Sequence, residues 1–152
     1  MPNPCLNEQR LCYDRETLGV GGMAVSKSTI AIVEDDASFR RALERLLRAS
    51  GFDAHTFASA EEFLGSTAPE SHACLILNIQ LPGMSGFELV DHLATSVPPP
   101  PAIFITARDA DSLRERASRI PNSVYLNKPF PGEVLLKAVR SRLRLTRKNH
   151  AL

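Results

Sequence analysis

The chain has 152 residues, of which 43% are hydrophobic and 23% are charged. This length suits one globular domain with a substantial core, and it is too short for two ordinary domains and a linker. Eighteen Lys and Arg residues against seventeen Asp and Glu residues leave a net charge of +1. A balance this close to neutral excludes a strong overall attraction to polyanions, so we expect no membrane partner and no direct DNA binding.

The first 27 residues lack the regular hydrophobic spacing of helices or strands. They contain two prolines and a Gly-rich stretch, so we predict a disordered N-terminal extension over residues 1–27. Met23 follows the glycines, and translation from Met23 is an open hypothesis. No signal peptide is visible, and Cys5, Cys12 and Cys74 are not clustered, which favours a cytoplasmic location.

From residue 29 onward, short apolar runs alternate with stretches of helical spacing. The runs are rich in β-branched residues and predict strands that are covered on both faces. The expected strands are residues 29–33, 53–57, 73–77, 102–106 and 123–126.

Apolar residues spaced three and four apart predict the helices between and after these strands. In the first helix they are Phe39, Ala42, Leu43, Leu46 and Leu47. Shorter helices are expected at residues 60–64, from about residue 85, and at residues 112–119. The helix after Pro131 is expected to face the core through Val134, Leu135, Ala138, Val139 and Leu143.

Five strands that are each followed by a helix predict an α/β fold with a parallel sheet. With right-handed crossovers, the expected architecture is a doubly wound, flavodoxin-like sheet with the strand order 2-1-3-4-5. We expect this domain over residues 28–145 and a basic C-terminal tail over residues 146–152. The functional site of such a sheet lies at the carboxyl ends of its strands.

Polar residues follow or end four of the expected strands. Glu34 and Asp35 follow the first strand, Asn78 the third, Thr106 ends the fourth, and Lys128 lies just beyond the fifth. Adjacent carboxylates repel each other, and a divalent cation with oxygen ligands, Mg²⁺ above all, offsets this repulsion. Together with a lysine and a hydroxyl, such a site is suited to stabilising a phosphoryl group.

Four segments of the chain resemble the receiver domain of two-component response regulators. The closest resemblance is to receivers attached to LuxR-type output domains, and the motifs occur in order at family-like spacing between about residues 28 and 145. The segments are Val33–Asp36, Leu75–Gly86, Phe104–Ala107 and Leu126–Phe130.

This resemblance implies a role for each matching residue. It assigns Mg²⁺ to Glu34, Asp35 and the backbone carbonyl of Gln80. It assigns the phosphoryl group to the Thr106 hydroxyl and to Lys128, whose bond to the following proline is often cis in this family.

The resemblance also implies an aromatic switch three residues before the lysine. Tyr125 occupies this position, and in the family the aromatic ring turns inward when the threonine moves. An ordinary core or surface tyrosine remains an alternative for Tyr125.

One position departs from the family, because Asn78 stands where receivers have the aspartate that accepts the phosphoryl group. An amide oxygen carries no full charge and the amide nitrogen lone pair is delocalised, so we expect no aspartyl phosphate. The loss of one carboxylate should also weaken or abolish Mg²⁺ binding. The sequence leaves open whether Asn78 is natural or an altered aspartate.

Simpler alternatives exist for the other motifs. Glu34 and Asp35 could form an acidic turn before a helix that Asp36 caps, and Lys128 could be a solvated surface lysine. A run of basic residues follows Glu133, and we interpret it as a solvated helix face and tail in preference to a nucleic-acid contact. Its members are Lys137, Arg140, Arg142, Arg144, Arg147 and Lys148.

Two functional hypotheses follow, and neither is an enzyme. The first is a single-domain receiver in phosphorelay signal transduction that is impaired by Asn78. The second is a phosphorylation-independent interaction module, a pseudo-receiver, that acts on a sensor histidine kinase or another response regulator, or that forms a homodimer. It would bind through the fourth helix, fifth strand and fifth helix. We expect any transcriptional output to act through another polypeptide.

Overall fold

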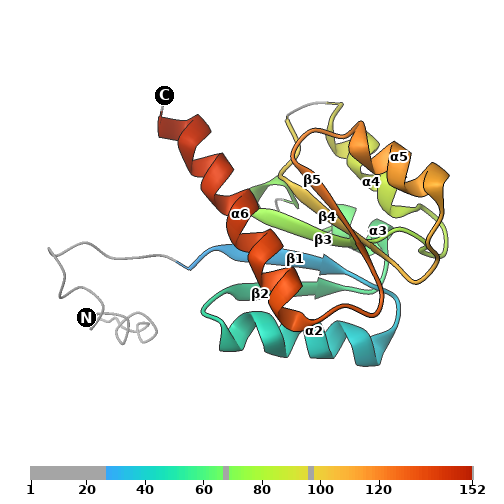
Figure 1. The fold of residues 1–152 in the computed structure, drawn as a ribbon, viewed down its shortest axis with the longest axis horizontal. Helices are drawn as coiled ribbons and strands as arrows, with labels where there is room; N and C mark the ends of the chain where they lie inside the picture. The colour runs from blue at the N-terminus through green and yellow to red at the C-terminus, as the bar shows by residue number, and fades with distance from the viewer. Residues whose placement is uncertain (1–26, 67–68, 96–97, 152) are drawn as a thin grey trace, which may run out of the picture.

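A parallel sheet of five strands in the order β2-β1-β3-β4-β5 lies at the centre of the computed structural model, which describes residues 27–66, 69–95 and 98–151 (Figure 1). This order confirms the predicted doubly wound, flavodoxin-like fold. The strands are β1 (Thr29–Val33), β2 (Asp53–Phe57), β3 (Cys74–Asn78), β4 (Ala102–Thr106) and β5 (Ser123–Asn127).

Helices cover both faces of the sheet, as right-handed crossovers between parallel strands require. On one face lie α2 (Ala37–Ala49) and α6 (Gly132–Ala151). On the other lie α3 (Ala60–Leu64), α4 (Gly86–Leu93) and α5 (Asp111–Ser118). A short 3₁₀ turn, η3 (Pro69–Ser71), precedes β3.

Burial explains why the strands are so apolar. Every residue of β3 and β4 is buried, because these strands have neighbours on both sides and helices on both faces. The edge strands β2 and β5 are partly exposed, which agrees with the weaker apolar pattern of residues 53–57.

Two residues of the predicted core stripes lie on the surface instead. Val134 is 41% exposed and Ala42 is also exposed. In α6, Leu135, Val139 and Leu143 are buried, and Val134 lies about 100° around the helix from Leu135, outside that stripe. The prediction that Val134 faces the core was therefore wrong.

The last helix extends past the sheet at the C-terminal side. Helix α6 continues to Ala151, through residues 146–151 that the sequence assigned to a basic tail. At the other end, the predicted extension and Met23 lie outside the described residues, apart from the exposed Lys27.

The register of the strands brings their carboxyl ends to one edge of the sheet. Val33 is level with Leu77, and the next residue of β3, Asn78, is level with Ile105. Thr106 is level with Asn127. The polar residues that follow or end these strands therefore lie at the same edge, as predicted.

Candidate functional site

Six of the seven predicted site residues are linked by hydrogen bonds at the carboxyl edge of the sheet. They come from four different strand ends, which the register places level with one another. The six are Glu34, Asp35, Asn78, Gln80, Thr106 and Lys128.

Glu34 lies at the centre of this group with only 1% of its surface exposed. Its Oε1 is 3.0 Å from Nζ of Lys128, and its Oε2 accepts a hydrogen bond of 3.0 Å from the backbone N–H of Asp36. Burial raises the pKa of Glu34, against the opposing effects of the Asp36 N–H and the Lys128 ammonium. The Asp36 N–H and the Lys128 ion pair offset only part of the cost of burying this carboxylate, so the net effect on the pKa remains upward.

Lys128 is held by two neighbours. Its side chain is 19% exposed, and Nζ lies 4.5 Å from the centre of the Phe39 ring as well as against Glu34. The Lys128–Pro129 peptide bond is cis. With most of its side chain buried and its ammonium against Glu34, Lys128 does not have the surroundings of a solvated surface lysine.

Asn78 points its amide nitrogen at three oxygen acceptors. Nδ2 lies 2.9 Å from Oδ1 of Asp35, 3.2 Å from Oε2 of Glu34 and 3.2 Å from the backbone oxygen of Gln80. Carboxylate and carbonyl oxygens can only accept, so this orientation of the amide is the one that satisfies them. The side chain of a buried residue thus supplies hydrogens to the acidic pair.

Thr106 is fully buried, and its hydroxyl is used in both directions. Oγ1 lies 2.6 Å from Oε1 of Gln80, to which it donates, and it accepts a hydrogen bond of 2.9 Å from the backbone N–H of Arg108. The side chain of Gln80 is therefore part of the site, in addition to its backbone carbonyl.

Tyr125 is not hydrogen-bonded to this group among the described residues. Its hydroxyl donates to Oδ1 of Asp109 at 3.1 Å, and the guanidinium of Arg114 lies 4.8 Å from the ring centre. Arg114 also forms an ion pair with Asp109. Burial and the nearby Asp109 carboxylate raise the pKa of Tyr125.

Two residues that support the site, Arg40 and Glu61, were not predicted from the sequence. Arg40 donates from Nη1 to the backbone oxygen of Glu34 at 2.7 Å, and Glu61 of α3 accepts from the backbone N–H of Met84 in the loop after β3. Asp36 was identified correctly as a helix cap, since its side chain accepts from the N–H of Phe39. No local pattern predicts the first two contacts, because each joins separate elements.

The arrangement around Asn78 does not fit Mg²⁺. The oxygens of Asp35, Glu34 and Gln80 are the type of ligand that Mg²⁺ uses, but here they face hydrogens of the Asn78 amide. Only a rotation of the amide, with loss of these hydrogen bonds, would present Oδ1 to a cation. Within the described ranges, no cluster of three or more His, Cys, Asp and Glu side chains could hold a metal ion.

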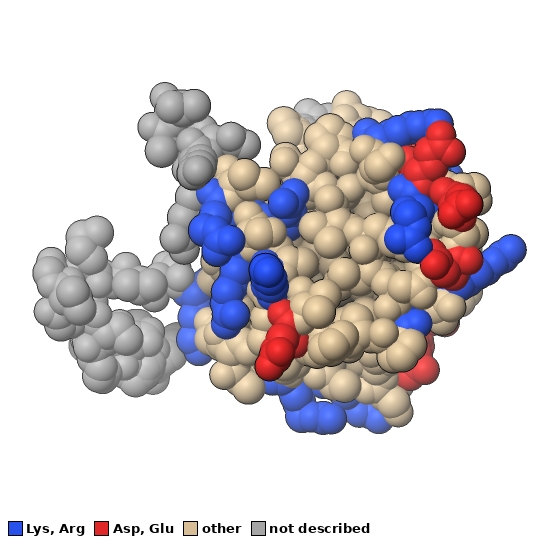
Figure 2. Space-filling model, in the orientation of Figure 1, with Lys and Arg blue, Asp and Glu red and all other residues tan. Residues whose placement is uncertain are grey.

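The opposite end of the sheet is basic. Figure 2 shows Lys and Arg side chains gathered along α6, whereas basic and acidic side chains lie together over α5. Arg116 of α5 forms an ion pair with Asp91, and Arg119, which caps the end of α5, forms one with Glu115. In the part of the chain that the structure describes, the side chain of Arg140 has no such partner.

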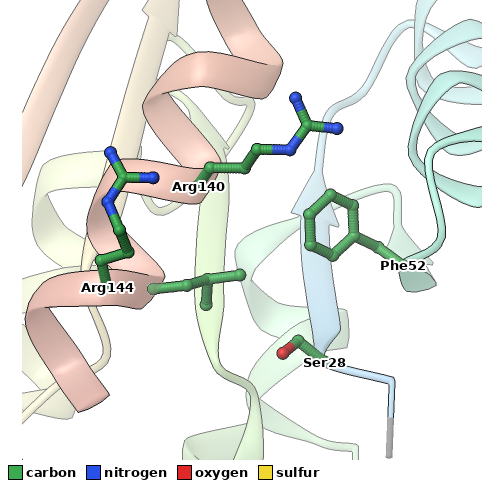
Figure 3. Close-up of a pocket in the computed structure, with 5 residues that line it drawn as sticks. Ser28, Phe52, Arg140 and Arg144 are labelled. Atoms are coloured by element: carbon green, nitrogen blue, oxygen red, sulfur yellow. The ribbon is translucent and has the colours of Figure 1, made fainter. Parts of the chain in front are cut away.

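A hollow of about 350 Å³ lies beside α6 at the start of β1 (Figure 3). Its lining combines two arginines with apolar side chains and one hydroxyl. The residues are Ser28, Phe52, Arg140, Leu143 and Arg144. This hollow lies at the amino ends of the strands, away from the acidic pair. Separately, the described helices include none of the length and apolarity that crossing a membrane requires.

Comparisons with solved structures agree with this fold. A receiver protein from Burkholderia phymatum is 38% identical, with a TM-score of 0.67 over 77% of this chain and 95% of that one. The response regulator StyR is also 38% identical, with a TM-score of 0.75 over 83% of this chain and 64% of that one.

Comparisons with sequences agree as well. Nodulation protein W of Bradyrhizobium diazoefficiens is 40% identical over 123 residues, which are 80% of this chain and 54% of that protein. The chain spans about half the length of the curated relatives it matches. The family model for the response regulator receiver domain matches residues 30–140. The chain therefore belongs to the receiver domain family of two-component response regulators.

Proposed function

We propose that this receiver takes part in two-component phosphorelay signalling without forming an aspartyl phosphate. In this proposal it acts in the cytoplasm as a pseudo-receiver, through protein contacts with a sensor histidine kinase or another response regulator. A homodimer is a further mode of action, and neither catalysis nor DNA binding is part of the proposal. The observation that supports it is the position of Asn78 among the acidic residues.

The chemistry of Asn78 argues against phosphoryl transfer. A phosphoacceptor must present an electron-rich oxygen to phosphorus, and a carboxylate does so with a full negative charge. The amide of Asn78 has no such charge, and its nitrogen donates hydrogen bonds to the carboxylates of Glu34 and Asp35. If no phosphoryl group is bound, its negative charge is absent, and phosphorylation cannot shift the conformation of this receiver.

The amide also replaces a cation electrostatically. In receivers, Mg²⁺ at this edge neutralises the acidic residues and supports phosphoryl transfer. Here Lys128 pairs with Glu34, and the amide hydrogens of Asn78 lie against both carboxylates. We therefore expect Mg²⁺ to bind weakly or not at all, because it must compete with these hydrogen bonds.

The direct test is phosphorylation by a small phosphodonor. We expect the intact mass of the whole chain to stay unchanged after incubation with acetyl phosphate and Mg²⁺, because Asn78 cannot accept the group. Asn78→Asp should gain one acid-stable, base-labile phosphoryl group and bind Mg²⁺ more tightly. A labile phosphoryl adduct on the wild-type chain would overturn the proposal.

Asn78→Asp also tests the rest of the site. If Asn78→Asp stays unphosphorylated although circular dichroism shows a folded protein, Asn78 is not the sole obstacle to phosphorylation. The position of Asn78 among the acidic residues would then be insufficient to support the proposal. Asn78→Ala is the matched control, because it removes the amide without restoring a carboxylate. It should remain unphosphorylated.

A further inference from the structure

We propose that the side chain of Gln80 holds the Thr106 hydroxyl in place of a phosphoryl oxygen and so sets the conformation of the loop that leads to Tyr125. Gln80 is a positioning residue in this proposal, since it acts through Thr106. The inference rests on the proposed function, because it concerns how a receiver that is not phosphorylated fixes its own switch.

The Thr106 hydroxyl has already used its capacity to donate a hydrogen bond. A hydroxyl has one hydrogen, and the contact of 2.6 Å to Oε1 of Gln80 is shorter than the 3.1 Å to the backbone oxygen of Arg108. The hydrogen therefore goes to Gln80. Thr106 has none left for another acceptor unless it releases Gln80.

Gln80 also connects Thr106 to the phosphoacceptor position. Its backbone oxygen accepts from Nδ2 of Asn78, while its side-chain oxygen accepts from Thr106. One residue thus joins the end of β3 to the end of β4 by two hydrogen bonds. Asn78 and Thr106 are both buried, so these two ends of the network are shielded from water, whereas Gln80 between them is exposed.

From Thr106 the network continues toward Tyr125. Oγ1 of Thr106 accepts from the backbone N–H of Arg108, which fixes the start of the loop after β4. The next residue, Asp109, accepts from the Tyr125 hydroxyl and pairs with Arg114. The position of Tyr125 is therefore coupled to Gln80 through contacts that the chain itself provides.

The test removes the side-chain acceptor oxygen of Gln80 and keeps the length of the side chain. In Gln80→Met, we expect the amide of Arg108 to exchange with deuterium about tenfold faster, because the loop opens more easily. In a Tyr13→Phe background, the absorbance titration of Tyr125 should shift toward that of an ordinary tyrosine. Gln80→Glu keeps an acceptor oxygen and should retain the wild-type behaviour of both signals.

Two further variants separate coupling from general damage. In a Thr106→Val background, Gln80→Met should change neither signal further, since the bond is already absent. Thr95→Val is the matched control, because the Thr95 hydroxyl bonds to the nearby backbone oxygen of His92 and, among the described residues, not to this network. It should leave Arg108 and Tyr125 unaffected.

The outcomes distinguish this inference from the proposed function. Unchanged exchange at Arg108 and an unchanged Tyr125 titration in Gln80→Met would overturn the role of Gln80, whatever the phosphorylation assay shows. Equal changes in Thr95→Val would also overturn it. A phosphoryl adduct on the wild-type chain would instead overturn the proposed function on which the inference rests.

Discussion

At the scale of single residues, Asn78 places hydrogen-bond donors where the aspartate of the proposed phosphoacceptor position would place only acceptors. A carboxylate can only accept, whereas the Asn78 amide donates to Asp35, Glu34 and the backbone of Gln80. The acidic pair is thereby stabilised by the chain's own hydrogens. Glu34 carries the largest remaining cost, because it is a carboxylate with 1% exposure.

The raised pKa of Glu34 predicts how stability depends on pH. The folded state keeps the Glu34 proton at pH values where the unfolded chain, with an ordinary value of 4.5, has lost it. The contribution of Glu34 is thus full below pH 4.5 and is lost as pH rises through the folded pKa, by about 1.4 kcal/mol for each unit of elevation. We expect the free energy of unfolding of the wild type, relative to Glu34→Gln, to fall between pH 4.5 and neutral pH.

Urea unfolding followed by circular dichroism at several pH values measures this difference. Glu133→Gln is the control, because it neutralises an exposed carboxylate far from the acidic pair in the chain. A difference for Glu34→Gln that is flat, or that rises with pH, would contradict the assignment.

At the scale of elements, the start of α4 is fitted closely to the end of β3. Ser85 and Glu88 form a reciprocal capping box, and Gly86 directly follows the cap. A Cβ atom at Gly86 would lie 2.6 Å from the backbone oxygen of Asn78, which real contacts do not reach. The position of the Asn78 backbone therefore depends on a glycine eight residues later.

Gly86→Ala tests this fit. We expect it to destabilise the protein by about 2 kcal/mol, because β3 and α4 must separate to admit the methyl group. The backbone amide signals of Asn78 and Ile79 should shift in nuclear magnetic resonance spectra. Urea unfolding measures the loss of stability.

Gly65→Ala is the matched control for Gly86→Ala. There a Cβ atom would lie 3.5 Å from the nearest backbone oxygen, an ordinary contact. We expect an effect within about 0.5 kcal/mol. Equal stability of the two variants would show that the close approach at Gly86 relaxes without cost.

At the scale of the whole molecule, the sheet and its two helical layers form separate core clusters on each face. Phe104 belongs to the cluster beneath α3, α4 and α5, is fully buried, and its ring lies 4.8 Å from that of Phe87. Because β4 is paired on both sides, a cavity at this position cannot be filled by movement of an edge.

Phe104→Ala should therefore cost about 3–5 kcal/mol in the free energy of unfolding, measured by equilibrium urea denaturation. Val134→Ala is the control on the other face, because Val134 is 41% exposed and its methyl groups contribute little. A loss of the same size in both variants would argue against the assigned core.

The sequence by itself determined the fold and the identity of most site residues. Apolar runs and helical spacing predicted the five strands and their order, since parallel strands need crossovers and both faces need cover. The proposal that Asn78 replaces an aspartate needed no coordinates, because it concerns a residue type within a motif. Element ends differed by a residue, as at β3, which begins at Cys74 and includes Asn78.

Only the tertiary structure decided which side chains meet. Gln80 and Thr106 are 26 residues apart, and their contact depends on the register of β3 and β4 and on the path of the loop between them. The orientation of the Asn78 amide and the exposure of Val134 likewise depend on neighbours from other elements. Local spacing reports the period of one element, whereas such contacts arise from the packing of several.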